Sequence, residues 1–135
     1  MAFGSIDFAL DIAADHDDPA LLLARSTLVL ASRAAGLRAP VDGVTSHVHD
    51  TVKVTTDARR SRALGFGGKL CIHPAQIGPV AEAFAPSAAE VAWAREVVSR
   101  AVAAQGGAIE VHGQMIDRPM LSRAERLLAA ASSPS

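Results

Sequence analysis

Two aspartates at opposite ends of the chain are candidates for chemistry. Asp7 follows a short apolar opening that passes Gly4, so we expect it just beyond the end of a strand. A carboxylate is a hard oxygen ligand, and Mg²⁺ typically takes one or two of them and completes its shell with water or substrate. Asp117 lies between Met115-Ile116 and Pro119-Met120, an apolar setting that suits a carboxyl group in proton transfer. The structural alternatives are a turn or N-cap aspartate at the first position and the N-cap of the last helix at the second.

The histidines give a weaker indication of a metal centre. His47 and His49 alternate, so on a strand they would share a face and form a second possible metal site. The five histidines include no HExxH pair, and Cys71 is the one cysteine, so the sequence indicates neither a zinc enzyme nor a structural zinc site. His73 and Pro74 stand where an apolar run meets a new helix, and we expect the imidazole to order this turn by hydrogen bonding rather than to act as a base.

Two further patterns raise the question of phosphate binding. Arg59, Arg60 and Arg62 lie together on one expected helix, where they either bind a phosphate group or form a solvated helix face. The glycine-rich stretch 65–68 precedes a strand and does not join a strand to a helix, so it is interpreted as a helix C-cap and turn. A self-contained nucleotide-binding domain is therefore a poor fit to the sequence.

Capping signals mark where the helices that hold these residues begin and end. Asp17 precedes Pro19 in an N-cap pattern, Asp50 offers a second N-cap, and Ser87 and Glu90 form a capping box. Apolar residues recur at helical spacing after these signals, and glycines follow where several of the helices should stop. We therefore expect helices from Pro19 to Gly36, from Asp50 to Gly65, after Gln76 toward Phe84, from Ser87 to about Gly106, and from about Pro119 to Ala131.

Short apolar runs between these helices predict strands at Pro40–Val44 and Lys69–Ile72, and a short β segment at Ala108–Ile116. The alternation with helices predicts parallel strands joined by right-handed crossovers, with ligands at the C-terminal strand ends. Two α/β architectures are compatible with this order. One is half of a (β/α)₈ barrel, since a whole barrel needs about 200 to 250 residues. The other is a small open three-layer sheet that is complete here, and length alone favours it.

The bulk properties limit the kinds of partner. The chain has 135 residues, half of them hydrophobic, which is enough to bury a core. Its 13 basic and 14 acidic residues balance to −1, so we expect a small molecule or another protein as partner and no nucleic acid or membrane. No secretory signal opens the chain, and no apolar run reaches the ~18 residues that span a bilayer. A single cysteine fits a reducing compartment, and we expect a cytoplasmic protein.

Three separated segments resemble the citrate lyase β-subunit and malyl-CoA lyase family, within the HpcH/HpaI aldolase superfamily. They are Phe3–Phe8, Ala63–Ile77 with its core Lys69–Ile77, and Gly113–Pro119, and they occur in the family's order and spacing. Asp42-Gly43 and Asp50 extend the match over nearly the whole chain. Members of the superfamily are Mg²⁺-dependent lyases that cleave C–C bonds in acyl-CoA substrates. The resemblance therefore implies such an activity on citryl-, malyl- or citramalyl-CoA.

The resemblance also implies roles for four residues. Asp7 matches the aspartate that holds Mg²⁺ in the family. Asp117 matches an aspartate in a C-terminal lid that enters a neighbouring subunit's site and transfers a proton at the α-carbon of the CoA thioester. His73 and Pro74 match the turn beside the CoA-binding region. A homo-oligomer that exchanges its lids between subunits is implied as well.

The fold implied by the resemblance is the C-terminal half of a TIM-type (β/α)₈ barrel. Residues 1–86 would supply its later strands and residues 87–135 a helical extension, or lid. Family members also have an earlier barrel half, with a partner glutamate for the metal and an arginine for the substrate, and this sequence lacks that half. We expect the chain alone to be inactive or nearly so unless another chain supplies the remainder. The alternative is a catalytically inactive remnant that serves as an interaction or oligomerisation module.

Overall fold

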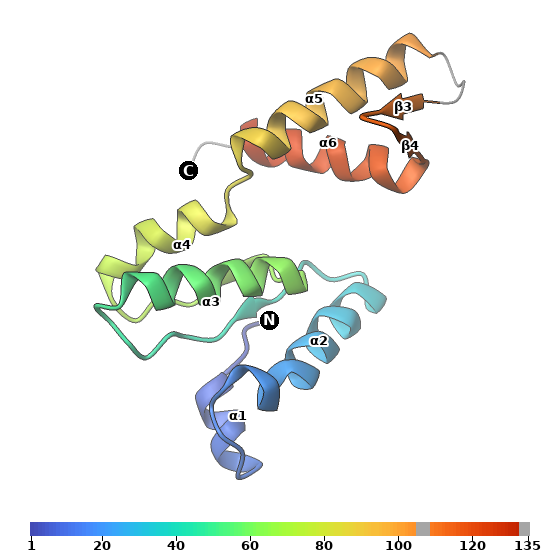
Figure 1. Cartoon of the computed structure of the whole chain (residues 1–135). Helices are drawn as coiled ribbons and strands as arrows, with labels where there is room; N and C mark the ends of the chain where they lie inside the picture. The colour runs from blue at the N-terminus through green and yellow to red at the C-terminus, as the bar shows by residue number, and fades with distance from the viewer. Residues whose placement is uncertain (105–108, 133–135) are drawn as a thin grey trace. The chain divides into compact units, whose positions relative to one another are not determined.

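The structure is a computed structural model that describes residues 1–104 and 109–132 (Figure 1). It divides into two compact units, Met1–Phe84 and Ala85–Ser135. The first unit contains α1 (Ser5–Asp11), α2 (Asp18–Ala34), β1 (Val41–Asp42), α3 (Thr51–Leu64), β2 (Gly68–Lys69), the 3₁₀ turn η1 (Pro74–Gln76) and α4 (Ile77–Phe84). The second contains α5 (Ala88–Ala103), β3 (Ile109–Val111), β4 (Gln114–Ile116) and α6 (Arg118–Ser132).

The strands of the first unit are parallel, as the alternation of elements predicts. In the pairing of β1 with β2, Val41 lies opposite Gly68 and Asp42 lies opposite Lys69. Ala2 forms a parallel bridge to Val41 on the other side of β1. The opening segment, β1 and β2 therefore lie in that order, with α1 and α2 between the first two and α3 between the last two.

These strands are shorter than predicted, because side chains take over the backbone groups at their ends. Of the predicted strand Pro40–Val44, only the two residues of β1 form a strand. The strand stops there because the amide of Gly43 donates to the Asp42 carboxylate at 2.8 Å. The predicted strand Lys69–Ile72 is replaced by β2, which ends at Lys69, the residue where that strand was expected to begin. Beyond β2, the amide of Ile72 donates to the Gln76 side chain at 2.9 Å. Each strand thus gives way early to a loop held by a polar side chain.

The predicted caps of the first unit are confirmed. Asp17 caps α2 by accepting from the amide of Ala20, and Asp50 caps α3 by accepting from the amide of Lys53, both at 2.9 Å. Gly65 ends α3 with φ +99°, the left-handed conformation that favours glycine at this position.

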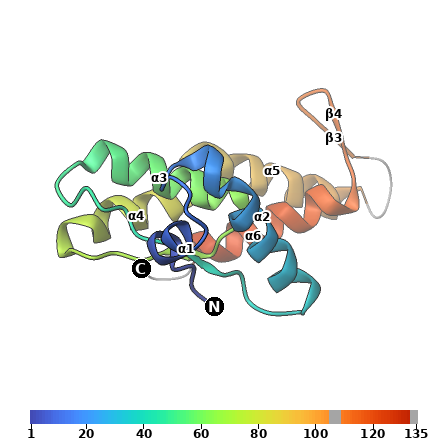
Figure 2. The same cartoon turned by 90° about the horizontal axis from the view of Figure 1, so that it is seen from below.

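The core of the first unit lies between α3 and α4, which pack side by side (Figure 2). Val54 and Ala58 of α3 and Val80 and Ala83 of α4 are buried there. Their spacing along each helix, three or four residues, places each pair on one face.

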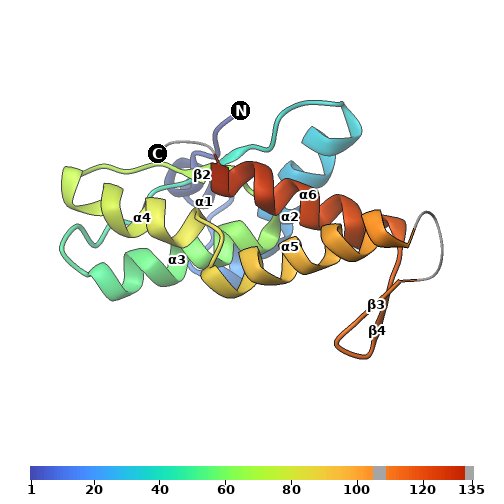
Figure 3. The ribbon, with the colours of Figure 1, turned by 90° about the horizontal axis from the view of Figure 1, so that it is seen from above.

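The second unit is a helical hairpin closed by a β-ribbon. Its two helices, α5 and α6, run side by side (Figure 3), and β3 pairs with β4 in antiparallel register. His112 and Gly113 both have positive φ (51° and 78°), as a tight two-residue hairpin turn requires. The predicted capping box is confirmed, with both Ser87 and Glu90 bonded reciprocally. The helix end predicted near Gly106 lies outside the described residues.

The core of the second unit joins all four of its elements. It consists of small and β-branched side chains that are buried together: Ala94, Val97, Val111, Ile116 and Ala124. Alanine at the helix contacts lets α5 and α6 approach closely. Among the described residues of both units, no helix combines the length and apolar character needed to cross a membrane.

Candidate functional site

The polar centre of the first unit is a buried carboxylate, Asp42, at the end of β1. It is fully buried, and its Oδ1 accepts from Arg25 Nε at 3.1 Å and from the amide of Gly43. The Ser61 hydroxyl donates to its Oδ2. Arg25 is also buried, with 3% of its side chain exposed. Because two buried charges are tolerated only when paired and hydrogen-bonded, this group fixes α2, β1 and α3 to one another.

The turn after β1 lies directly against the chain opening. A Cβ built on Gly43 would lie 2.1 Å from Ser5 Oγ and 3.0 Å from the carbonyl oxygen of Phe3. No side chain fits in that space, so glycine is required by the close approach of the two segments.

The two loops that follow β1 and β2 are held together by Gln76. Its buried side chain donates to the carbonyl oxygen of Thr45 and accepts from the amide of Ile72, both at 2.9 Å. Lys69 adds a second connection, because its Nζ donates to the carbonyl oxygen of Gly43 at 2.6 Å. Burial lowers the pKa of Lys69. The C-terminal ends of both strands therefore form one connected surface.

Asp57 of α3 faces the loop after β1. Its Oδ2 accepts from the Thr45 hydroxyl at 2.7 Å, and its Oδ1 pairs with Arg60 at 3.2 Å and Lys53 at 3.5 Å. Burial alone would raise the pKa of Asp57, but the Thr45 hydrogen bond and the charges of Arg60, Lys53 and Lys69 outweigh it and lower the pKa. Asp57 is thus an ionised, anchored carboxylate.

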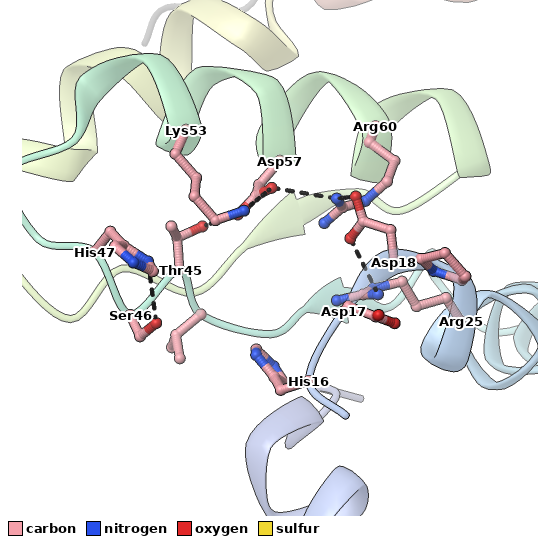
Figure 4. Close-up of a pocket in the computed structure, with 12 residues that line it drawn as sticks. His16, Asp17, Asp18, Arg25, Thr45, Ser46, His47, Lys53, Asp57 and Arg60 are labelled. Atoms are coloured by element: carbon pink, nitrogen blue, oxygen red, sulfur yellow. Dashed lines mark hydrogen bonds and ion pairs between the residues drawn. The ribbon is translucent and has the colours of Figure 1, made fainter. Parts of the chain in front are cut away.

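Arg25, Thr45 and Asp57 line a cavity of about 330 Å³ between the N-terminus of α2, the loop after β1 and α3 (Figure 4). Asp18 lies between two guanidinium groups there, paired with Arg60 Nη1 and 3.9 Å from Arg25 Nη1. The pKa of His16 is lowered by burial and by the charges of Arg25 and Lys69. The lining residues are His16, Asp17, Asp18, Pro19, Arg25, Val44, Thr45, Ser46, His47, Lys53, Asp57 and Arg60.

The predicted residues Asp7, His73 and Pro74 all belong to the first unit, and none of them lines this cavity. Asp7 is exposed in the first turn of α1, with its Oδ2 near Gly4. His73 caps η1: its Nδ1 accepts from the amide of Ala75 at 3.1 Å, and Pro74 is the first residue of the turn. The prediction that His73 orders this turn is confirmed.

His47 and His49 lie in the loop after β1 and not on a strand, so the shared strand face predicted for them does not form. His47 lines the cavity, whereas the ring of His49 lies edge-on to that of His73, with 5.4 Å between centroids. Across residues 1–104 and 109–132, no group of three or more His, Cys, Asp or Glu side chains is arranged to hold a metal ion.

Asp117 lies in the second unit and caps α6. Its Oδ1 accepts from the amide of Met120 at 2.9 Å, which confirms the structural alternative raised by its sequence context. The two apolar residues before it differ in burial: Ile116 is buried in the core, whereas Met115 is 73% exposed. The carboxylate itself is exposed, and a role in proton transfer stays a prediction.

Sequence reasoning missed the residues that build this network. Arg25 and Ser32 interrupt the otherwise apolar face of α2, about one and about three turns after the buried Leu21. Asp57 and Ser61 share the buried side of α3 with Val54. A polar residue at the spacing of a buried helix face is the signal that could have found them.

The fold and the site define a class of α/β protein, in which parallel strands joined by helices carry polar groups at their C-terminal ends. Residues 1–74 match the model of the HpcH/HpaI aldolase/citrate lyase family, and the chain belongs to that family. It is 41% identical to a citrate lyase subunit beta-like protein of Deinococcus radiodurans, over 94% of this chain and 46% of the relative. It is 36% identical to human mitochondrial citramalyl-CoA lyase, over 98% of this chain and 40% of that enzyme.

Solved structures give the same result. The chain resembles CitE from Mycobacterium tuberculosis in complex with magnesium, acetoacetate and coenzyme A, with a TM-score of 0.84 and 33% identity over 98% of this chain and 52% of CitE. It also resembles a citrate lyase from Burkholderia xenovorans, with a TM-score of 0.81 and 30% identity over 96% of this chain and 44% of the other. These matches establish an α/β fold of the aldolase superfamily. The chain spans about half the length of the relatives and structures it matches, or less.

Proposed function

We propose that this chain forms part of a Mg²⁺-dependent lyase that cleaves a C–C bond in an acyl-CoA substrate such as citryl-, malyl- or citramalyl-CoA. The observation that carries the proposal is similarity to lyases over almost the whole chain, including 36% identity to citramalyl-CoA lyase over 98% of it. The CitE structure bound to magnesium and coenzyme A supports both the metal and the CoA thioester.

The proposed fold is the later half of a (β/α)₈ barrel, residues 1–86, followed by a lid, residues 87–135. The parallel order of the opening, β1 and β2, with helices between them, supports the barrel assignment. The helical hairpin of α5 and α6 supports a separate extension. A barrel would require further strands on both edges of this three-segment sheet.

Asp7 fits the role of a partial Mg²⁺ ligand. It presents one exposed hard oxygen donor in the first turn of α1, and Mg²⁺ needs only one or two such carboxylates beside water and substrate. Bound there, Mg²⁺ would polarise the substrate carbonyl and carboxylate oxygens. His73 and Pro74 would form part of the wall on the CoA side. Asp117 would act from the lid as the acid or base, in a homo-oligomer whose lids reach neighbouring subunits.

A metal titration tests the proposed ligand on the chain itself. Mn²⁺, a paramagnetic substitute for Mg²⁺, should broaden the amide signals around Asp7 in the NMR spectrum. Asp7→Asn should abolish the broadening. Asp11→Asn, one turn further along the same helix and also exposed, should leave it intact. Equal broadening in the two variants would remove Asp7 from the metal site.

A chimaera tests the activity. In it, this chain replaces the matched segment of the Deinococcus radiodurans relative, which supplies the remaining length. The chimaera should cleave an acyl-CoA substrate when Mg²⁺ is present, and Asp7→Asn should reduce the rate at least about 100-fold, whereas Asp11→Asn should not. A folded chimaera that leaves all three candidate substrates intact would contradict the proposal.

A second candidate is a catalytically inactive form that binds a second copy of itself. It is favoured by an apolar groove of about 490 Å³ between the chain opening, α1 and α2. Leu23 and Ile12 line this groove and are 78% and 48% exposed. Large exposed apolar surfaces commonly mark protein contacts. Sedimentation equilibrium should then show a dimer that Leu23→Glu dissociates, and a monomer at all concentrations would exclude this form.

A further inference from the structure

We propose that the cavity at the N-terminus of α2 binds a phosphate-type anion between the guanidinium groups of Arg25 and Arg60, in competition with the Asp18 carboxylate. This site does not depend on the lyase activity, since it contains neither Asp7 nor Asp117.

A carboxylate of the chain already occupies the proposed anion position. The Asp18 carboxylate lies between the two guanidinium groups, bonded to Arg60 Nη1 through Oδ2 and 3.9 Å from Arg25 Nη1 through Oδ1 (Figure 4). Arg25 extends from α2 and Arg60 from α3, so the two groups approach it from different elements. The chain thus demonstrates with its own side chain that the geometry accepts an oxyanion.

Two guanidinium N–H groups at this position have no acceptor in the part of the chain that the structure describes. Arg25 Nη1 is buried and has no hydrogen-bond partner among the described residues, and the same is true of Arg60 Nε. The Arg25 side chain is 97% buried, since only 3% of it is exposed, and it lines the cavity. Buried polar groups are nearly always hydrogen-bonded, because an unpaired donor loses its hydration without compensation. An anion with several oxygens would supply acceptors that the two oxygens of Asp18 do not.

Of the three acidic side chains that line the cavity, Asp18 is the one that can move away. Asp57 is bonded to Thr45 and is buried, so it is fixed. Asp17 is the N-cap of α2 and accepts a hydrogen bond from the amide of Ala20. Asp18 is 52% exposed, and within residues 1–104 and 109–132 its carboxylate pairs with the two arginines alone, so it can turn outward into solvent. A ligand therefore competes with Asp18 and with no other carboxylate of the cavity.

The ligand class follows from the donors. Arginine presents a planar fork of N–H groups that matches the oxygens of phosphate, and charge-assisted bonds of this kind are the strong ones. Lys53, which also lines the cavity, adds a third cation at the rim. The helix amides contribute little, because Ala20 is already bonded to Asp17 and Pro19 has no N–H. A cavity of about 330 Å³ admits a phosphate together with water or a small ester group.

The test is an NMR titration of the complete chain with inorganic phosphate at constant ionic strength, with chloride as the control anion. The Nε–H signals of Arg25 and Arg60 should move with phosphate and not with chloride. Asp18→Asn should tighten binding about fivefold, because it removes the competing charge. Arg60→Gln should weaken binding at least about tenfold. A parallel titration with methyl phosphate separates the sources: equal binding points to an esterified phosphate, and loss of binding points to the free ion.

Arg59→Gln is the matched control, because Arg59 is the neighbouring arginine on α3, is exposed and does not line the cavity. It should bind phosphate as the unmodified chain does. The proposal is overturned if phosphate moves signals over the whole surface, or if Asp18→Asn and Arg59→Gln both leave the affinity unchanged. Should Arg60→Gln fail to fold, Asp18→Asn still decides, because Asp18 is half exposed and its removal leaves the Asp17 cap in place.

Discussion

The buried pair of Arg25 and Asp42 should dominate the stability of the first unit. Arg25→Met keeps most of the apolar volume of the side chain but leaves the Asp42 carboxylate buried without its cation. Breaking a buried pair in this way typically costs about 3 to 5 kcal/mol. Asp42 retains its hydrogen bonds from Ser61 and from the amide of Gly43, so the lower end of that range, about 3 kcal/mol, is expected.

Such a loss is a large part of the total stability of a domain, about 5 to 15 kcal/mol. Urea denaturation followed by circular dichroism gives the free energy of unfolding. Arg33→Met is the matched control, since Arg33 is exposed in the last turn of the same helix and should change stability by less than about 0.5 kcal/mol.

A second substitution isolates the cause. Asp42→Asn in the Arg25→Met background removes the uncompensated charge and should recover about 1 to 2 kcal/mol. If Arg25→Met is as stable as Arg33→Met, the pair contributes nothing and the reasoning is refuted. If the double variant is less stable than Arg25→Met, the lost hydrogen bonds and not the buried charge explain the effect.

Three further changes test the caps and the ionised network. Gly65→Ala should cost at least about 1 kcal/mol, because φ is +99° there and the added carbon would lie 2.9 Å from a neighbouring side chain. Gly78→Ala, in the first turn of α4, has no atom of the described residues within 4 Å apart from its chain neighbours and its helix's own backbone. It should change stability by less than about 0.5 kcal/mol, because the following Pro79 offsets the gain in helix propensity. Asp57 has a lowered pKa in the folded state, so its contribution is present above the unfolded pKa and is lost as the pH falls through the folded pKa. Asp57→Asn should therefore cost about 1 kcal/mol at neutral pH and converge with the unmodified chain in acid. Asp117→Ala should cost about 1 kcal/mol by removing the α6 cap, and Asp117→Ser should restore most of it.

Each of these has a result that would contradict it. Melting curves that rank the alanine variant at Gly65 above the one at Gly78 would mean that α3 does not end in the left-handed turn. A constant gap between the Asp57→Asn variant and the unmodified chain from pH 2 to pH 7 would show that ionisation of Asp57 is not linked to folding. For Asp117, the chimaera separates two roles: Asp117→Ser should lose lyase activity if the carboxyl transfers a proton, and full activity would leave it as a cap alone.

The helix boundaries could be predicted because caps act over three or four residues. Asp17, Asp50 and Ser87 each bond an amide close to them in the chain, and a sequence displays such pairs directly. Strand lengths could not be predicted, since the Asp42 side chain binds the amide that follows β1 and the Gln76 side chain binds the amide of Ile72, three residues beyond β2. Those hydrogen bonds depend on the folded loops and not on the apolar pattern.

The cavity could not be predicted for a related reason. Arg25 reaches Asp42 across 17 residues, and Arg60 reaches Asp18 across 42, so the contacts exist only once α2 and α3 pack beside β1. The sequence placed Arg60 among three arginines on one helix but could not distinguish the half-buried Arg60 from the exposed Arg59. Helical spacing from the buried Ala58 and Ser61 does not separate neighbours at the edge of a face.

Gly43 influences the proposed metal ligand although it never touches it. The opening segment can lie against the end of β1 only because no carbon projects from this residue toward Ser5 and Phe3. Ser5 is the first residue of α1, and Asp7 is two residues further along the same turn. A single methyl group at Gly43 would displace the start of that helix and carry the carboxylate with it, without altering its charge or its exposure. The position of the proposed ligand Asp7 thus depends on the absence of a side chain at Gly43, thirty-six positions away in the chain.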